Sequence, residues 1–273
     1  MVTNDVFERE ILAKHISVLD LLELHPSLNL PFSEFLASLT PTRVRHYSIA
    51  SSPLASQTRA TITYGIISGP AFSGHGNFAG VTGTYLSTLK PGDKIQVSVR
   101  PSAKALFKLP LSTDTPLLMF CSGTGLAPFR GFIQQRAIQA SANPGRKLAP
   151  ALLFVGCRSE SKDRLYAAEF DTWRTQGVVD MRYSFSREKE SSDGCGYVQD
   201  RLLRDRADVV EMWMKGARVY VCGSGGFVKE VSHAAKEIAR ERRRAMGEEL
   251  SERELEALFE EQMAGRTATD VFG

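Results

Sequence analysis

The second half of the chain alternates short apolar runs with amphipathic stretches. The apolar runs lie at 116–121, 151–156, 179–185 and 217–222, and helical patterns follow them at 129–141, 166–176, 198–213 and 227–246. Apolar runs of this length that alternate with helices are typical of a parallel sheet covered on both faces. Ser251 with Glu254 three positions later forms a capping box, which predicts a last helix that ends near Met263, before Gly265. The pattern therefore predicts a doubly wound α/β domain over 116–273.

The first half is β-rich and is interrupted by turn signals. The segments RHYSIA, ATITYGIIS and DKIQVSVR, at 45–50, 60–68 and 93–100, are separated by Ser-Pro, Ser-Gly, Gly-His-Gly and Pro-Gly turns. This predicts part of an antiparallel barrel over 45–115, because three strands cannot close a barrel and leave open edges. Before it, helical spacing over 5–24 and 33–39 predicts short helices in a segment 1–44.

Length and charge narrow the class of protein. A chain of 273 residues that is 42% hydrophobic has enough apolar residues for one or two domains with a core, so disorder is excluded for most of it. The net charge of +3 is too even for a nucleic-acid surface that covers the whole protein. No apolar run approaches the roughly 20 residues of a membrane span, and no charged-then-apolar leader follows Met1. We therefore expect a cytoplasmic chain without a membrane span.

The four cysteines do not form metal-ligand pairs. Cys121, Cys157, Cys195 and Cys222 are far apart, and no C-x-x-C pair occurs, so we expect no metal site. Three of them, at 121, 157 and 222, end apolar runs that predict strands. One interpretation is that a small apolar residue suits a strand end.

A glycine-rich turn follows the first predicted strand of the α/β domain. In CSGTGLAPFRGF, the strand runs into Gly123, Thr124 and Gly125, and a helix opens at Pro128. Such a turn aims backbone N–H groups at an anion, although a purely structural strand-to-helix turn is an equal alternative. CGSGG at 222–226 and GCR at 156–158 follow two further strands. Three such turns at one edge of a parallel sheet favour an extended ligand that carries phosphates.

Polar and basic residues near the same edge indicate the kind of dinucleotide. Arg158, Ser186, Arg187 and Lys189 suit an additional phosphate, which favours NADP over NAD, although a solvated face of mixed charge with Glu188 and Glu190 is the competing interpretation. In the β-rich part, Arg45 and Tyr47 share a strand face by the period of two. A Tyr ring there would cover a flat cofactor while the Arg meets its phosphate.

A series of motifs resembles one known family. In order along the chain they are RHYSIASSP, GVTGTYL, CSGTGLAPFRGF, LLFVGCR, SFSRE, GYVQDRL, VYVCGSG and the terminal DVF. Together they resemble the FAD/NADP(H) portion of diflavin reductases, most of all the reductase half of fungal self-sufficient monooxygenases, in which a cytochrome P-450 is fused to its NADPH-haemoprotein reductase. The resemblance implies a ferredoxin-NADP reductase-like fold, in which a partial antiparallel FAD barrel is followed by the doubly wound NADP domain.

The resemblance also implies roles for individual residues. On the FAD side, Arg45 contacts the pyrophosphate, Tyr47 stacks on the flavin ring, Ser48 bonds near its N5, Thr63, Tyr64 and Gly65 flank the cofactor, and Gly80, Val81 and Thr82 start the helix that holds the diphosphate. On the NADP side, Gly123, Thr124 and Gly125 cradle the pyrophosphate, and Ser186, Arg187, Tyr197 and Gln199 form the 2′-phosphate pocket, with Arg158 nearby. Cys222 lies beside the nicotinamide, Asp270 supports the transfer and Phe272 covers the flavin.

Several positions depart from the family pattern. Gly83 and Thr84 stand where a hydroxyl residue and Asn are usual, so we expect weaker FAD binding. Cys195 and Gly196 stand where a Lys is expected before Tyr197, so we expect a weaker preference for NADPH over NADH. Each lost charge-assisted hydrogen bond costs about 1.5–3 kcal/mol.

The resemblance implies an enzyme that transfers hydride from NADPH to FAD for onward one-electron transfer. The family's further barrel strands, most of its helical connecting domain, its FMN domain and a haem-thiolate cysteine signature are not found in this chain. An FMN domain and a haem monooxygenase domain would therefore act in trans or belong to a missing portion. Two alternatives are a truncated NADP-binding remnant with no stable FAD site and a stand-alone ferredoxin-type NADP reductase, which would need a complete barrel.

Overall fold

The computed structural model describes residues 4–100, 107–145 and 147–272, and two units compose it. One comprises Met1–Tyr47 and Tyr64–Val97, and the other comprises Ser48–Thr63 and Ser98–Gly273. We call them the smaller and the larger unit. Two sequence-based expectations fall on residues outside the described ones: the start of the chain at Met1, and part of the predicted barrel segment, at 101–106. The predicted division at 44/45 and 115/116 stays a prediction, although Ser48–Thr63 groups with the α/β part.

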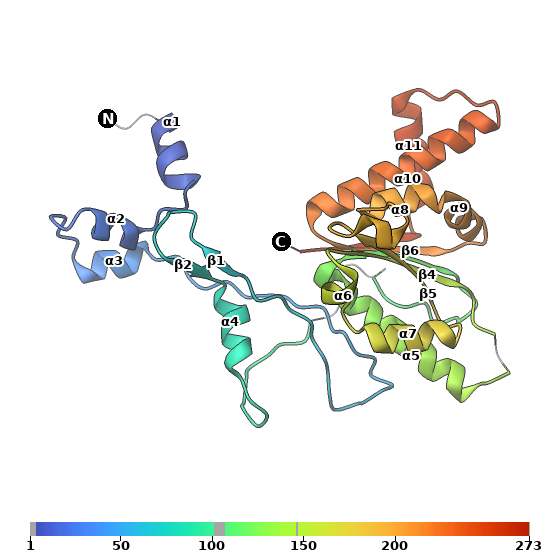
Figure 1. Ribbon diagram of the computed structural model, residues 1–273, viewed down its shortest axis with the longest axis horizontal. Coiled ribbons are helices and arrows are strands. Elements are labelled where there is room, and N and C mark those ends of the chain that lie inside the picture. The colour runs from blue at the N-terminus through green and yellow to red at the C-terminus, as the bar shows by residue number, and fades with distance from the viewer. Residues whose placement is uncertain (1–3, 101–106, 146, 273) are drawn as a thin grey trace. The chain divides into compact units, whose positions relative to one another are not determined.

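A five-stranded parallel sheet forms the centre of the larger unit (Figure 1). Its strands are β3 (Leu117–Ser122), β4 (Ala151–Cys157), β5 (Asp180–Phe185), β6 (Arg218–Gly223) and β7 (Thr267–Val271), in the spatial order β5-β4-β3-β6-β7. The four strands predicted from apolar runs are confirmed. The fifth, β7, was not predicted, because a partly exposed five-residue edge strand carries no continuous apolar run.

Helices cover both faces of this sheet, as predicted (Figure 1). Alternate residues of a strand point to opposite faces, so Leu117, Met119 and Cys121 pack with α5 (Ala127–Ala142) and α7 (Ala167–Thr175). Leu118 and Phe120 pack with the other helices. These are α8 (Val198–Arg204), α9 (Arg206–Met214) and α10 (Gly225–Ala245). The single helix expected over 198–213 is thus two helices, which meet at Asp205, where the backbone leaves helical geometry.

Short elements complete the larger unit. The turn η2 (Gly123–Leu126) is a 3-10 helix between β3 and α5, α6 (Glu160–Asp163) follows β4, and η3 (Lys189–Ser192) follows β5. The last helix, α11 (Glu252–Met263), begins after Ser251, whose hydroxyl accepts from the Glu254 N–H while the Glu254 carboxylate accepts from the Ser251 N–H at 2.8 Å. The capping-box prediction is confirmed.

The smaller unit contains short helices and one hairpin. The helices are α1 (Asn4–Phe7), the π-helix η1 (Glu8–Leu12), α2 (Val18–Leu24), α3 (Phe32–Ser38) and α4 (Val81–Thr88). The hairpin pairs β1 (Ser68–Pro70) with β2 (Asn77–Ala79) in antiparallel register. The helices predicted over 5–24 and 33–39 are confirmed, with a break before α2, where Ser17 caps the helix.

The partial barrel predicted over 45–115 forms only in part among the described residues. The segments 45–50 and 93–100 form no strand; the one pairing there is the isolated bridge between Ile49 and Ile62. A strand persists only when a neighbour satisfies its successive backbone N–H and C=O groups. Segment 45–50 meets its neighbour at one bridge only, where the Ala50 N–H donates to the Thr61 carbonyl at 2.7 Å. In segment 93–100 the apolar side chains remain open to solvent: Val97 is 75% exposed and Val99 is 77% exposed.

Candidate functional site

The chain order reverses at β3, and this reversal defines the candidate site. From β3 the chain moves outward through β4 and β5, then returns to the other side of β3 with β6 and β7. Ligands of open α/β sheets bind at such a switch point, outside the carboxyl ends of the strands. Cys121 of β3 pairs with Cys222 of β6, so the two glycine turns that follow these strands lie at the same edge. The sequence-based prediction that they share an edge is confirmed.

Gly123 and Gly125, the two glycines of the turn after β3, have different structural reasons for lacking a side chain. Gly123 is exposed, has a φ of +56° and has no atom within 4 Å of the position a Cβ would take, so it is the open part of the turn. Thr124 is half-buried beside it. Gly125 is buried, and a Cβ there would lie 2.3 Å from the Cys222 carbonyl oxygen. Close packing of the turn on β6 therefore accounts for Gly125 without any ligand, whereas Gly123 remains available to one.

Three predicted catalytic side chains come together at this edge. The Ser48 hydroxyl donates to Oδ2 of Asp270 at 2.8 Å. Cys222 pairs with Asp270 across β6 and β7, and its Sγ lies 4.0 Å from the same carboxylate oxygen. Phe272 is held next to them, because its backbone N–H donates to the Gly223 carbonyl at 3.1 Å. Residues far apart in the sequence thus form one cluster around the Asp270 carboxylate.

Burial keeps the cysteines at this edge protonated. Burial, followed by the nearby Asp270 charge, raises the pKa of the Cys222 thiol far above its usual range. Burial likewise raises the pKa of Cys121 well above the usual value, and that of Cys157 to about 11. A protonated, buried thiol is a poor nucleophile, so Cys222 is suited to a non-covalent contact rather than to covalent chemistry.

The position of Ser48 depends on a buried arginine that sequence reasoning missed. Arg130 of α5, 9% exposed, donates to the Ala50 carbonyl at 2.7 Å and to both carboxylate oxygens of Glu169 at 2.9 and 3.0 Å. Its guanidinium also lies 4.4 Å from the centre of the Tyr166 ring. These contacts hold the segment 48–63 on the α/β unit. The only sequence signal is a charged residue within the apolar helix start of APFRGF.

Two further contacts hold the same segment. The Ser52 N–H donates to the Gln134 side chain at 2.8 Å, and a Cβ on Gly131 would lie 3.3 Å from the Ser51 carbonyl oxygen. Thr63, expected to flank FAD, has its hydroxyl 2.8 Å from the Tyr166 hydroxyl.

The other residues expected on the FAD side lie in the smaller unit. Tyr47 and Tyr64 meet edge to face with ring centres 6.3 Å apart, and Arg45 is exposed. The predicted helix start at Gly80, Val81 and Thr82 coincides with the start of α4, for which Gly80 is the N-cap. A Cβ on Gly83 would lie 2.9 Å from the Gly65 carbonyl oxygen. Gly83, a departure from the family pattern, therefore has a packing reason.

The residues expected to form a 2′-phosphate pocket gather beyond the ends of β4 and β5. Backbone hydrogen bonds from Ser186 to the Cys157 carbonyl and from Arg187 to the Arg158 carbonyl continue the pairing of these strands. Arg158 already forms a two-pronged ion pair with Asp163, with both distances 2.9 Å. Tyr197, 55% exposed, precedes α8, and half-buried Gln199 lies in its first turn.

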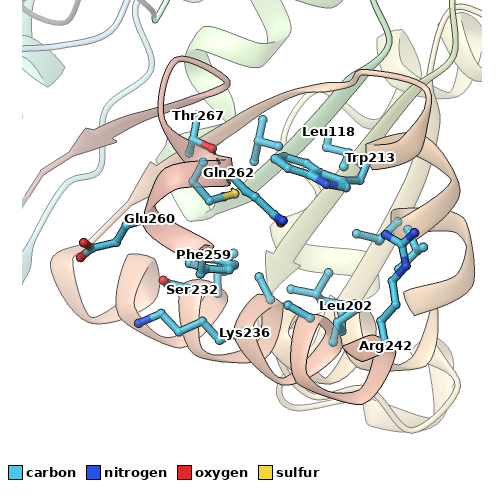
Figure 2. Close-up of a pocket in the computed structure, with 18 of the residues that line it drawn as sticks. Leu118, Leu202, Trp213, Ser232, Lys236, Arg242, Phe259, Glu260, Gln262 and Thr267 are labelled. Carbon is cyan, nitrogen blue, oxygen red and sulfur yellow. Dashed lines mark hydrogen bonds between the residues drawn. The ribbon is translucent and has the colours of Figure 1, made fainter. Parts of the chain in front are cut away.

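A separate cavity of about 740 Å³ lies on the face of the sheet covered by α9, α10 and α11 (Figure 2). Its wall includes Leu118 of β3, Trp213 of α9 and Phe259 of α11, and none of the predicted site residues lines it. Lys236, at its margin, is paired with Glu256. This cavity is therefore an apolar space within the helix layer, distinct from the edge that carries the polar cluster.

The described residues contain neither a cluster of metal-ligating side chains nor a helix that could span a membrane. No group of three or more His, Cys, Asp or Glu side chains in 4–100, 107–145 and 147–272 is arranged to hold a metal ion. Within the same ranges, no helix combines the length and the apolar character needed to cross a membrane.

The fold of the larger unit agrees with a comparison to known protein families. Residues 119–233 match the family described as oxidoreductase NAD-binding domain, so the larger unit contains a domain of that class. The chain is 48% identical over 270 residues to a bifunctional cytochrome P450/NADPH–P450 reductase of Fusarium oxysporum, an alignment that covers 98% of this chain and 25% of that protein. It is 44% identical over 264 residues to a self-sufficient cytochrome P450 monooxygenase of Phanerodontia chrysosporium, covering 96% of this chain and 24% of that protein.

A third relative, a bifunctional cytochrome P450/NADPH–P450 reductase of Acremonium egyptiacum, is 42% identical over 269 residues, which is 97% of this chain and 25% of that protein. Together with the match to the NAD-binding domain, these relatives show that the chain is similar to the reductase portion of the fungal self-sufficient P450/NADPH–P450 reductase fusions. The expected resemblance is confirmed. The chain spans about a quarter of the length of these relatives.

Proposed function

We propose that the chain is an NADPH-dependent oxidoreductase that transfers hydride from NADPH to FAD. The observation that carries the proposal is the cluster of Ser48, Asp270 and Cys222 at the switch point of the parallel sheet, where the Ser48 hydroxyl donates to Asp270 at 2.8 Å. A polar cluster at this edge, beside an open glycine turn, is the arrangement expected where a dinucleotide meets its reaction partner.

The NADP side of the site has groups that suit phosphates. Gly123 leaves the turn after β3 open, and the first turn of η2 offers backbone N–H groups next to it. Arg187 and Ser186, beyond β5, supply a cation and a hydroxyl for the 2′-phosphate, while Tyr197 offers an exposed ring to the adenine. These residues would hold NADP(H) along the carboxyl edge of the sheet.

The smaller unit carries its own groups that suit a flavin nucleotide. The N-terminus of α4 has no side-chain cap, so its backbone N–H groups can receive a diphosphate. Arg45 would add a positive charge, and Tyr47 an aromatic surface for the ring. When bound, FAD supplies the acceptor of the hydride and passes electrons on singly.

The residues of the cluster would act by charge and position. The Asp270 carboxylate would stabilise the positive charge that develops on the nicotinamide as hydride leaves, and the Ser48 hydroxyl would orient that carboxylate. The Cys222 thiol stays neutral because burial raises its pKa, so it would support the ring without a covalent bond. Phe272 would cover the flavin and exclude water until the nicotinamide displaces it.

The relatives' names support a route for the electrons. They are called cytochrome P450/NADPH–P450 reductases, so we propose that the electrons pass to an FMN domain and then to a haem monooxygenase domain, in trans or in another part of a longer protein.

The proposal is tested with the purified chain. With FAD and ferricyanide added, we expect NADPH oxidation followed at 340 nm, and a rate at least tenfold lower in Asp270→Ala because a carboxylate interaction is lost. Absence of NADPH oxidation in the unmodified chain at saturating FAD would overturn the proposal.

The alternative, a non-catalytic NADP-binding remnant, is favoured by one observation: the segments 45–50 and 93–100 form no strand. A barrel that does not close would not retain flavin. Flavin absorbance of the purified protein separates the two functions: a yellow protein supports the oxidoreductase, whereas a colourless protein that still binds NADP supports the remnant.

A further inference from the structure

The side chain of Lys189 occupies the space next to Gly196. A Cβ built on Gly196 would lie 2.7 Å from Cε, 3.3 Å from Cδ and 3.4 Å from Cγ of Lys189. The methylene chain of the lysine therefore lies across the glycine backbone, directly before Tyr197. The absence of a side chain at 196 is what makes room for the lysine.

A buried serine fixes the turn that places Lys189 there. The Ser192 hydroxyl accepts from the Phe185 N–H at 3.0 Å and donates to the Cys195 carbonyl at 2.7 Å. The Gly194 N–H donates to the Lys189 carbonyl at 2.8 Å. These bonds join the end of β5 to the residues before α8. Lys189 is consequently held at the phosphate end of the candidate site even though its side chain is exposed.

Three of the carboxylates around Lys189 have other partners, whereas Glu190, next to it in the chain, is exposed. Asp193 pairs with Arg201 at 3.0 Å, Asp200 accepts from the Tyr197 N–H at 2.9 Å, and Glu188 accepts from the Glu160 N–H at 2.8 Å. Within the part of the chain that the structure describes, neither Lys189 nor Arg187 forms an ion pair. Lys189 therefore remains without a paired carboxylate among the described residues, while Arg187 lies near enough to Asp163 to help lower the pKa of that carboxyl, after the larger effect of Arg158.

We propose that Lys189 is a specificity-determining residue, whose ammonium group reaches across Gly196 to the 2′-phosphate of NADP(H). The inference rests on the proposed function and names which residue distinguishes NADPH from NADH. A phosphate monoester carries a charge of about −1.5 to −2 at pH 7, so a second cation beside Arg187 stabilises it, and a lysine can act as that point charge. The lysine missing before Tyr197 is thus supplied by the preceding turn.

The test measures binding by the full chain, with no catalytic step. Isothermal titration calorimetry with 2′,5′-ADP and with 5′-ADP reports the 2′-phosphate separately from the rest of the nucleotide. In Lys189→Ala we expect 2′,5′-ADP to bind about tenfold more weakly, or worse, while 5′-ADP binds as before. Lys189→Arg keeps the charge and should retain most of the affinity. Lys215→Ala, at the opposite edge of the sheet, is the control and should change neither ligand.

Gly196→Ala provides an independent arm. The three atoms nearest to the added methyl group all belong to the flexible side chain of Lys189, so the fold should persist while the lysine is displaced. We expect weaker 2′,5′-ADP binding in Gly196→Ala, and little additional effect of this change in the Lys189→Ala background, because both changes remove the same interaction.

The possible failures are distinguishable. If the unmodified chain binds neither nucleotide, the proposed function fails and this inference fails with it. If the unmodified chain binds 2′,5′-ADP more tightly than 5′-ADP, and Lys189→Ala binds each ligand as tightly as the unmodified chain does, only the role of Lys189 is overturned. Equal weakening of both ligands in Lys189→Ala would also overturn it, because a role at the 2′-phosphate affects one ligand alone.

Discussion

Replacing Gly125 by alanine should destabilise the larger unit. At a position with free space and no positive φ, the same replacement would stabilise the protein. Gly125 does not have a positive φ, so removing glycine's freedom in the unfolded chain would by itself stabilise the protein by about 0.4–1 kcal/mol. The new Cβ, however, would lie 2.3 Å from the Cys222 carbonyl oxygen and 2.9 Å from its carbon. An ordinary contact of about 3.5 Å requires the turn and β6 to separate by roughly 1 Å.

Overpacking of this kind costs about 1–3 kcal/mol. In a domain of this size each kcal/mol lowers the melting temperature by about 2–4 °C, so thermal unfolding followed by circular dichroism should shift down by about 2–12 °C. Gly226→Ala is the matched control, since the only atom within reach of its Cβ is the Ser224 hydroxyl at 4.0 Å. It should melt at or above the unmodified protein. If Gly125→Ala also melts at or above it, the close approach of the turn to β6 is refuted.

Three more outcomes follow from the site. Ser48→Ala removes the donor to Asp270, so FAD-dependent NADPH oxidation should fall about tenfold or more with 2′,5′-ADP affinity unchanged; equal rates would contradict the cluster. Arg130→Met removes the hydrogen bond to the Ala50 carbonyl, so the free energy of unfolding measured in urea should fall by about 1.5–3 kcal/mol, and protease cleavage within 48–63 should be faster. Unchanged cleavage would disprove the anchoring role. Burial raises the Cys157 pKa from 9.0 to about 11, so the unfolded state loses this proton first, and the free energy of unfolding should fall as pH rises from 9 to 11. The fall should be less steep in Cys157→Ala, and identical slopes of this free energy against pH would rule the explanation out.

Local periodicity was sufficient for most of the α/β unit. The apolar runs that became β3, β4 and β6 are buried on both faces along most of their length, so hydrophobicity alone marks them, whereas β5, at the sheet edge, is only partly buried. The capping box at Ser251 is likewise a contact between residues three positions apart, which a sequence displays directly. The order of glycine turns after these strands then predicted the edge at which the candidate site lies.

Elements that depend on neighbours were predicted poorly. The strand β7 is an edge strand whose alternate residues remain partly exposed, and its pairing with β6 is what makes it a strand. The segments 45–50 and 93–100 have strand-like composition, yet they form no ladder without partners. Composition reports how well a residue suits a sheet, whereas a hydrogen-bonded ladder needs a second strand.

The sequence by itself determined the alternation of strands and helices, the glycine turns and the residue types of the site, because these are set by contacts within a few positions. Only the tertiary structure decided that Ser48 donates to Asp270, that Arg130 holds the segment that carries Ser48, and that Lys189 fills the space at Gly196. The physical reason is that each of these contacts joins segments whose distance is fixed by packing, and packing depends on the whole fold rather than on the local pattern.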